Sequence, residues 1–183
     1  DSLTYSATLA DGSALPSWLS FDPSTQTFSG TPLNEDVGGL NVRVTATDTS
    51  GASASQDFTV TVANVNDAPV ASVTIADQST DEDAGFSFTL PASSFTDVDV
   101  GDSLTYAASL ADGSPLPSWL SFDSATQTFS GTPLNEDVGA LSIRVTATDT
   151  AGASASQDFT VTVNNTNDAP VITSSGAAGF AEN

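Results

Sequence analysis

Leu141-Ser142-Ile143-Arg144-Val145-Thr146-Ala147-Thr148 alternates apolar and polar side chains along its whole length. Residues 86–90 and 159–163 show the same alternation, with Phe, Leu or Val at every second position and Ser or Thr between them. Successive side chains of a strand point to opposite faces of a sheet, whereas a helix brings every third or fourth residue to one face. The pattern therefore predicts half-buried antiparallel strands with a wet face of Ser and Thr.

Short strands are also expected near residues 70–76, 103–109, 118–122 and 127–131, with Gly, Pro, Asp and Ser between them. No segment has the period of a helix. About seven short strands in about 100 residues are typical of an immunoglobulin-like β-sandwich. We therefore expect an all-β fold built from antiparallel sandwiches.

The chain contains a long internal repeat. When residues 1–70 are laid over residues 102–171, 59 of the 70 positions are identical. Asn66-Asp67-Ala68-Pro69 returns as Asn167-Asp168-Ala169-Pro170, and a proline there suits a short linker or the first residue of a strand. A period of about 100 residues is too long for a solenoid and matches a tandem array of whole domains.

The repeat also predicts the domain boundaries. We expect residues 1–67 to form an incomplete repeat that lacks its first strands, residues 68–168 a complete repeat, and residues 169–183 the start of a third. An incomplete sandwich exposes an unpaired sheet edge and part of its core. Pairing between residues 1–67 of one molecule and residues 169–183 of another is then expected to make the chain oligomerise.

The composition is strongly acidic, with 23 Asp and Glu, 2 Lys and Arg, and a formal net charge of −21. Two cations, Arg43 and Arg144, are too few to neutralise a nucleic-acid backbone or to hold an anionic membrane surface. The absence of His and Cys excludes a Ser-His-Asp triad, a thiolate nucleophile and a zinc-thiolate site. No apolar run reaches the roughly 18 residues of a spanning helix. We therefore expect no nucleic-acid partner and no membrane insertion. The carboxylate pairs Glu35/Asp36 and Glu136/Asp137 could in principle serve a glycosidase. Sequence neighbours on a loop rarely face one substrate from opposite sides, however, so we expect no enzyme.

The carboxylates gather in five clusters, most of which recur with the repeat. The clusters are residues 97–102, residues 80–83, residues 34–36 with their copy 135–137, Asp48 with its copy Asp149, and the linkers 64–67 and 165–168. Near-alternate aspartates in one loop, as in residues 97–102, can converge on Ca²⁺, which takes about six to eight oxygen ligands. A solvated turn is the alternative for any one cluster. Five clusters at domain ends and linkers favour calcium, whereas Asp57 and Asp158 outside them are expected in turns or on solvated faces.

Two motifs connect the chain to a known family. The first is Leu-Pro-Ser-Trp-Leu-Ser-Phe-Asp followed by Thr-Gln-Thr-Phe-Ser-Gly-Thr-Pro, in residues 15–32 and again in 116–133. The second runs from Ala-Thr-Asp-Thr through Phe-Thr-Val-Thr-Val to Asn-Asp-Ala-Pro. With these motifs the chain resembles the bacterial cadherin-like repeats of large surface adhesins, also called dystroglycan-type cadherin-like or putative immunoglobulin-like repeats. The resemblance implies tandem sandwiches with Ca²⁺ held at each junction.

The resemblance also implies which residues hold the metal. For the first junction it implies linker ligands, paired aspartates, a late-strand aspartate and a contribution from the preceding repeat: Asn66, Asp67, Asp97, Asp99, Asp149, and Asp36 with Glu35. For the second junction it implies Glu82, Asp137 with Glu136, Asn167 and Asp168. Residues 34–36 read Asn-Glu-Asp where cadherins usually carry Asp-x-Glu, and the linkers also depart from the cadherin pattern. One or two ions per junction are therefore expected.

The leading interpretation is a Ca²⁺-stiffened repeat of an extracellular or surface-bound bacterial adhesin, with neighbouring repeats of the same chain as its partners. One alternative is a module that binds polysaccharide through Trp18 and Trp119, although a position in the core is favoured for both indoles. A second alternative is homotypic adhesion to another copy of the repeat.

Overall fold

The computed structural model describes residues 2–171, and these residues divide into two compact units. The first unit comprises residues 2–70, 95–105 and 148–155. The second comprises residues 71–94, 106–147 and 156–171. The first unit therefore joins the first repeat to two loop regions of the second repeat, and those two regions carry the candidate site described below.

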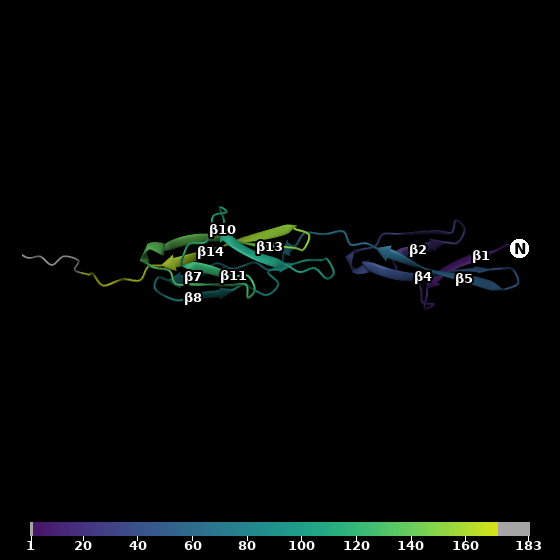
Figure 1. The fold of residues 1–183 in the computed structure, drawn as a ribbon, viewed down its shortest axis with the longest axis horizontal. Coiled ribbons are helices and arrows are strands. Elements are labelled where there is room, and N and C mark those ends of the chain that lie inside the picture. The colour runs from purple at the N-terminus through teal and green to yellow at the C-terminus, as the bar shows by residue number, and fades with distance from the viewer. Residues whose placement is uncertain (1, 172–183) are drawn as a thin grey trace, which may run out of the picture. The chain divides into compact units, whose positions relative to one another are not determined.

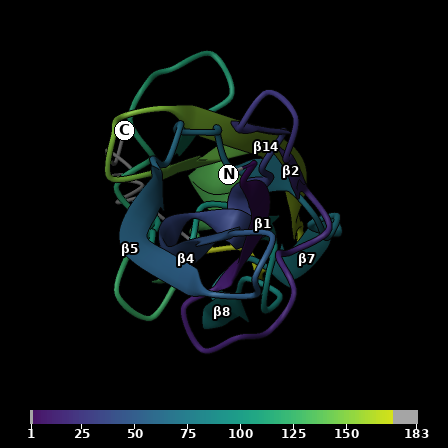
Figure 2. The ribbon, with the colours of Figure 1, turned by 90° about the vertical axis from the view of Figure 1, so that its right-hand side faces the viewer.

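The first repeat forms two small antiparallel sheets. One has the order β1-β4-β5, from Thr4–Leu9, Gly38–Thr47 and Ser53–Val62. The other pairs β2 (Leu19–Asp22) with β3 (Thr27–Gly30), and a 3₁₀ turn, η1 (Asn34–Asp36), follows. Figure 2 shows β1, β4 and β5 side by side.

The second repeat has the same strands and several more (Figure 1). Its larger sheet has the order β10-β13-β14-β7, from Thr105–Leu110, Gly139–Thr148, Ser154–Asn164 and Gln78–Asp81. A facing sheet has the order β11-β12-β8, from Leu120–Asp123, Thr128–Gly131 and Phe86–Thr89. The short strands β6 (Val70–Ala71) and β9 (Phe95–Thr96) pair with each other, and η2 is Asn135–Asp137.

Alternating side chains from both sheets fill the core of the second repeat. Ile143 and Val145 of β13, Val161 of β14 and Phe129 of β12 are all 0% exposed. Their sequence neighbours Arg144, Thr146 and others on the same strands lie on the wetter face. The antiparallel β-sandwich predicted from the period of two is therefore confirmed.

One strand departs from the prediction. The strand expected near 70–76 ends at Ala71, and the next strand, β7, pairs in parallel with β14. β7 has the sequence Gln-Ser-Thr-Asp, which lacks an apolar alternation. Its position depends on backbone pairing, from Val161↔Gln78 to Asn164↔Asp81, and the side-chain pattern carries no sign of it.

The two tryptophans, for which a position in the core was favoured, are half-buried. The Trp119 ring meets Phe86 edge-on with 6.4 Å between ring centroids. A Cβ at Gly131 would overlap the Trp119 carbonyl oxygen, so glycine is needed where β12 passes the Trp119 backbone.

No helix within residues 2–171 is long and apolar enough to cross a membrane. Most of the segment expected to begin a third repeat, residues 172–183, lies outside the described residues, and so does the pairing predicted for it.

Candidate metal centre

The loop after β9 presents its aspartates through its own backbone. The amide of Asp99 donates to Asp97 Oδ1 at 2.9 Å, and the amide of Asp102 donates to the Asp99 carbonyl at 3.2 Å. Gly101 has φ +87°, a conformation that side-chain-bearing residues rarely adopt. These turns give the loop a tight curvature that brings Asp97 and Asp102 together.

The linker supplies two further partners. The Asn66 side-chain amide donates to Asp149 Oδ2 at 2.9 Å, and the Asp67 backbone amide donates to Asp99 Oδ2 at 2.8 Å. Asp149 follows β13, and its Oδ1 accepts the amide of Ala153 at 2.8 Å in a tight turn. The hydrogen bond from Asn66 is the main reason that the pKa of Asp149 lies below its ordinary value.

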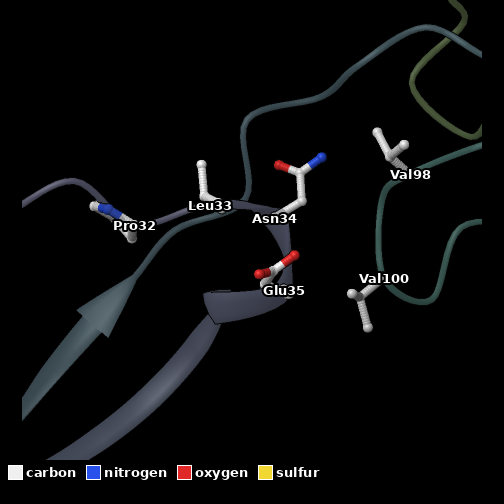
Figure 3. Close-up of a pocket in the computed structure, with 6 residues that line it drawn as sticks. All are labelled: Pro32, Leu33, Asn34, Glu35, Val98 and Val100. Carbon is white, nitrogen blue, oxygen red and sulfur yellow. The ribbon is translucent and has the colours of Figure 1, made fainter. Parts of the chain in front are cut away.

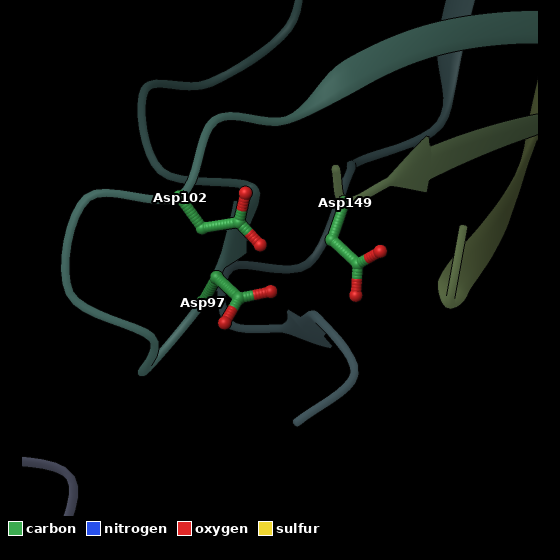
Figure 4. A group of neighbouring side chains, drawn as sticks. All are labelled: Asp97, Asp102 and Asp149. Atoms are coloured by element: carbon green, nitrogen blue, oxygen red, sulfur yellow. The ribbon is translucent and has the colours of Figure 1, made fainter. Parts of the chain in front are cut away.

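Three carboxylates share one small space at this point. Oxygen atoms of Asp97, Asp102 and Asp149 all lie within 4.8 Å of one another, and Figure 4 shows the three side chains as neighbours. The Thr150 hydroxyl and amide donate to Asp102 Oδ1, which lowers the pKa of Asp102. A polar hollow adjoins the group and is lined in part by Asn64, Asn66, Asp99 and Asp102.

Two carboxylate oxygens of this loop lack any partner among the described residues. Asp97 Oδ2 and Asp99 Oδ1 are buried and accept no hydrogen bond, and Asp99 as a whole is only 7% exposed. A buried, unpaired carboxylate oxygen is costly, because it has lost its water without gaining a donor. Such atoms are better explained as ligands of a cation than as parts of a solvated turn.

The sequence offers no basic side chain to neutralise the cluster. Its two arginines are engaged elsewhere: Arg43 pairs with Asp57 at 2.6 Å, and Arg144 pairs with Asp158 at 2.8 Å. The donor set is therefore all oxygen and anionic, which matches a hard divalent cation such as Ca²⁺. The residues present therefore fit such an ion.

Asp102 is absent from the ligand set that the family resemblance implies, because in this loop the cadherin pattern includes only the paired aspartates Asp97 and Asp99. Its position five residues after Asp97, in a glycine-containing loop, was the available signal. The structure nevertheless brings an oxygen atom of Asp102 within 4.8 Å of oxygen atoms of Asp97 and Asp149.

Asp36 and Glu35, which were expected as ligands of the first junction, are not in the three-carboxylate group found among the described residues. Asp36 Oδ2 accepts the Leu33 amide at 2.9 Å, and Glu35 is exposed. Asn34 donates to Asp67 Oδ2 at 2.9 Å. Figure 3 shows Asn34 and Glu35 lining a hollow with the exposed side chains of Val98 and Val100. With Glu35 as its single carboxylate, this hollow is a poor cation site.

Of the residues implied for the second junction, Glu82 is the one that is buried. Glu82 is 3% exposed, its Oε1 accepts the Thr166 amide at 2.6 Å, and its buried Oε2 has no partner among residues 2–171. Asp137 Oδ2 accepts the Leu134 amide at 2.8 Å. Three others are exposed: Glu136, Asn167 and Asp168. Within the described chain these residues form no group of three close carboxylates.

The strand order and the loop cluster define a cadherin-like β-sandwich with a candidate cation site. The sequence matches the family described as "Putative Ig domain" over residues 1–63 and 68–164, and the chain belongs to that family.

The related segments lie within much longer proteins. The chain is 32% identical over 164 residues to "Serine-rich adhesin for platelets" of Staphylococcus aureus strains MRSA252 and USA300. Each match covers 89% of this chain but only 11% and 7% of the two adhesins. The chain therefore spans a small fraction of the curated relatives that it matches.

Among solved structures, "Protocadherin gammaB7 EC3-6 cis-dimer structure" has 22% identity and a TM-score of 0.63, covering 91% of this chain and 41% of that one. Human mucin-like protocadherin EC1-2 has 18% identity and a TM-score of 0.62, covering 88% and 85%. These likenesses establish the cadherin-like fold.

Proposed function

We propose that this chain is a calcium-binding repeat that stiffens a bacterial surface adhesin. One observation carries the proposal: the buried, unpartnered oxygens of Asp97 and Asp99 lie in the same loop as a three-carboxylate cluster that no basic residue neutralises. A solvated turn explains the sequence spacing but gives no reason to bury these atoms without donors.

Each residue of the site has a distinct part in the proposal. Asp97, Asp102 and Asp149 offer the closest oxygens, and Asp99 presents a free oxygen while its other oxygen holds the linker amide of Asp67. Bound Ca²⁺ would neutralise the mutual repulsion of these carboxylates. Asn66 and Asp67 lie in the linker, so holding them against this loop restricts the motion of the linker itself.

The proposed role in adhesion is based on the names of the related proteins. Long proteins named as adhesins contain the related segment, and the family is one of sandwich domains. A repeat with an acidic surface and a metal-dependent linker suits a spacer that projects from a cell into a calcium-rich medium. Extracellular modules bind calcium with dissociation constants of about 10⁻⁴–10⁻³ M, which is the range that we expect here.

Calcium titration by calorimetry tests this function on the full chain. Wild type should bind Ca²⁺ in that range, and Asp97→Asn should weaken binding by at least about tenfold. The matched control is Asp48→Asn, since Asp48 is the sequence copy of Asp149 and makes the same turn, with its Oδ1 accepting the amides of Ser50 and Ala52. This control should bind like wild type.

The proposal fails if wild type releases no binding heat and its melting temperature is the same in calcium and in chelator. It also fails if Asp48→Asn weakens binding as much as Asp97→Asn, because the heat would then come from acidic turns in general.

A further inference from the structure

A parallel pair of strands joins the beginning of the second repeat to its end. β7 stands near the beginning of this repeat in the sequence, and β14 stands near its end. The two strands run in the same direction, with a register from Val161↔Gln78 to Asn164↔Asp81. Both ladders of residues belong to the same compact unit. The pairing therefore ties together two segments that leave the repeat at opposite ends of its sequence.

Side-chain hydrogen bonds extend this contact to the segment just before β7, where the described chain forms no strand. Gln157 Nε2 donates to the Val73 carbonyl at 2.9 Å, and Gln157 Oε1 accepts the Ile75 amide at 3.2 Å. Nearer to β7, the Thr160 amide donates to Asp77 Oδ1 at 2.7 Å. The side chains of Gln157 and Asp77 thus supply hydrogen bonds where backbone pairing is missing.

The contact also continues beyond the C-terminal ends of the two strands. The Glu82 amide donates to the Asn164 carbonyl at 3.0 Å, and the Thr166 amide donates to Glu82 Oε1 at 2.6 Å. Residues 73–82 therefore lie in parallel against residues 157–166, with hydrogen bonds at both ends and in the middle. We call these two segments the parallel clamp.

The direction of the two strands decides how the clamp responds to tension. A pull on the chain before β7 and on the chain after β14 slides the two parallel strands along each other. All hydrogen bonds of the clamp then bear the force together, and they must break together. A pull on the adjacent C-terminal ends of the two strands instead opens the hydrogen bonds one after another, which needs less force.

We propose that the parallel clamp bears tension and keeps the second repeat folded when the chain is stretched. This role goes beyond calcium binding, because the clamp shares no residue with the carboxylate group of Asp97, Asp102 and Asp149. Within the clamp, Gln157 is the main side chain that resists the pull ahead of β7. Besides its bonds to residues 73 and 75, its Nε2 donates to the Ser94 carbonyl at 3.1 Å.

The absence of cysteine from the sequence allows the direction of pulling to be chosen with introduced cysteine pairs in the full chain. Ala68→Cys with Asn167→Cys pulls along the clamp, and Gly85→Cys with Asn165→Cys pulls on its adjacent C-terminal ends. All four positions are exposed, and a Cβ at Gly85 meets nothing within 4 Å. At one constant force, in optical tweezers and in chelator, the second repeat should unfold at least about tenfold more slowly with the first pair.

Substitutions in the first pulling geometry test which contacts resist the force. Gln157→Ala removes hydrogen bonds to three backbone groups, so the unfolding rate at constant force should rise at least about tenfold. Asp77→Ala removes the bond to the Thr160 amide and should raise the rate at least about threefold.

Gly131→Ala is the matched control, because it destabilises the repeat outside the clamp. Its Cβ would overlap the Trp119 carbonyl oxygen, in the facing sheet. Since the clamp breaks before β12 is disturbed, the rate under force should stay within about twofold of wild type.

Equal unfolding rates in the two pulling geometries would overturn the proposal, and so would equal acceleration by Gln157→Ala and Gly131→Ala. Urea denaturation first establishes that each variant is folded. If Gln157→Ala does not fold, Asp77→Ala decides: faster unfolding than Gly131→Ala supports the clamp, and an equal rate contradicts it. Because chelator is present throughout, none of these outcomes depends on whether the chain binds calcium.

Discussion

The side-chain amide of Asn66 donates to Asp149 Oδ2 at 2.9 Å across 83 residues of sequence. This hydrogen bond joins the linker to the turn after β13, and it directs one carboxylate oxygen of the candidate site. Asp149 is 5% exposed, so few waters can replace the amide if it is lost.

We predict that Asn66→Ala lowers the free energy of unfolding by about 1 kcal/mol in calcium-free buffer, measured by urea denaturation. The same variant should bind calcium several-fold more weakly, because Asp149 is then free to rotate away from Asp97 and Asp102. If the variant equals wild type in both stability and calcium affinity, the Asn66 amide does not position Asp149.

The turn after β2 gives a pH prediction with an internal reference. Hydrogen bonds from the Ser24 hydroxyl and amide lower the pKa of Asp22 to about 2. A folded-state pKa below the unfolded value of about 3.9 stabilises the turn above that value, and the contribution is lost as the pH falls from about 4 to 2. Ser24→Ala should raise the pKa of Asp22 as measured by NMR titration of its carboxyl carbon.

The copy of Asp22, Asp123, is the reference for this measurement. It has Ala125 in place of Ser24, so it lacks the counterpart of the Ser24 hydroxyl, and it accepts the amides of Ala125 and Thr126 at 2.8 and 3.2 Å. The titration of Asp123 should be unchanged in Ser24→Ala. An unchanged Asp22 would mean that the backbone amides alone set its pKa.

Gly131 tests the packing of the second repeat. Ala at this position would drive its Cβ into the Trp119 carbonyl oxygen, and backbone must move to admit it. We expect Gly131→Ala to cost about 2 kcal/mol or more in a urea unfolding experiment. Gly39→Ala is the matched control: its Cβ would meet only the Thr59 methyl group at 3.6 Å, and the second repeat already has Ala140 there. Equal costs for the two variants would refute the packing argument.

The period of two was sufficient to predict β13 and β14, because burial of one sheet face imposes that pattern directly on the sequence. It could not predict β7, whose polar side chains contribute little and whose place depends on backbone pairing with a distant strand. The same limit applies to Phe58, which has the sequence of a buried core position but is 39% exposed. The exposure of Phe58 depends on which strands lie beside β5, and the local sequence pattern does not indicate those neighbours.

The candidate site was predictable in part. Asp97, Asp99, Asp149 and the linker residues followed from spacing and family resemblance, and the structure brings them together. Asp102 belongs to the predicted cluster of residues 97–102, but the resemblance did not imply it as a ligand, and its proximity to Asp149 depends on the fold of two separate loops. Asp57, expected in a turn or on a solvated face, is exposed on β5, and it also forms a cross-strand ion pair with Arg43.

The most direct test of the calcium site is the melting temperature of Asp99→Asn with and without calcium. In chelator the buried Asp99 Oδ1 is an acceptor without a donor, so we predict that the variant is more stable than wild type by about 1 kcal/mol. Calcium should then raise the melting temperature of wild type by several degrees and leave the variant almost unchanged. A variant less stable than wild type in chelator, with both proteins indifferent to calcium, would contradict the account.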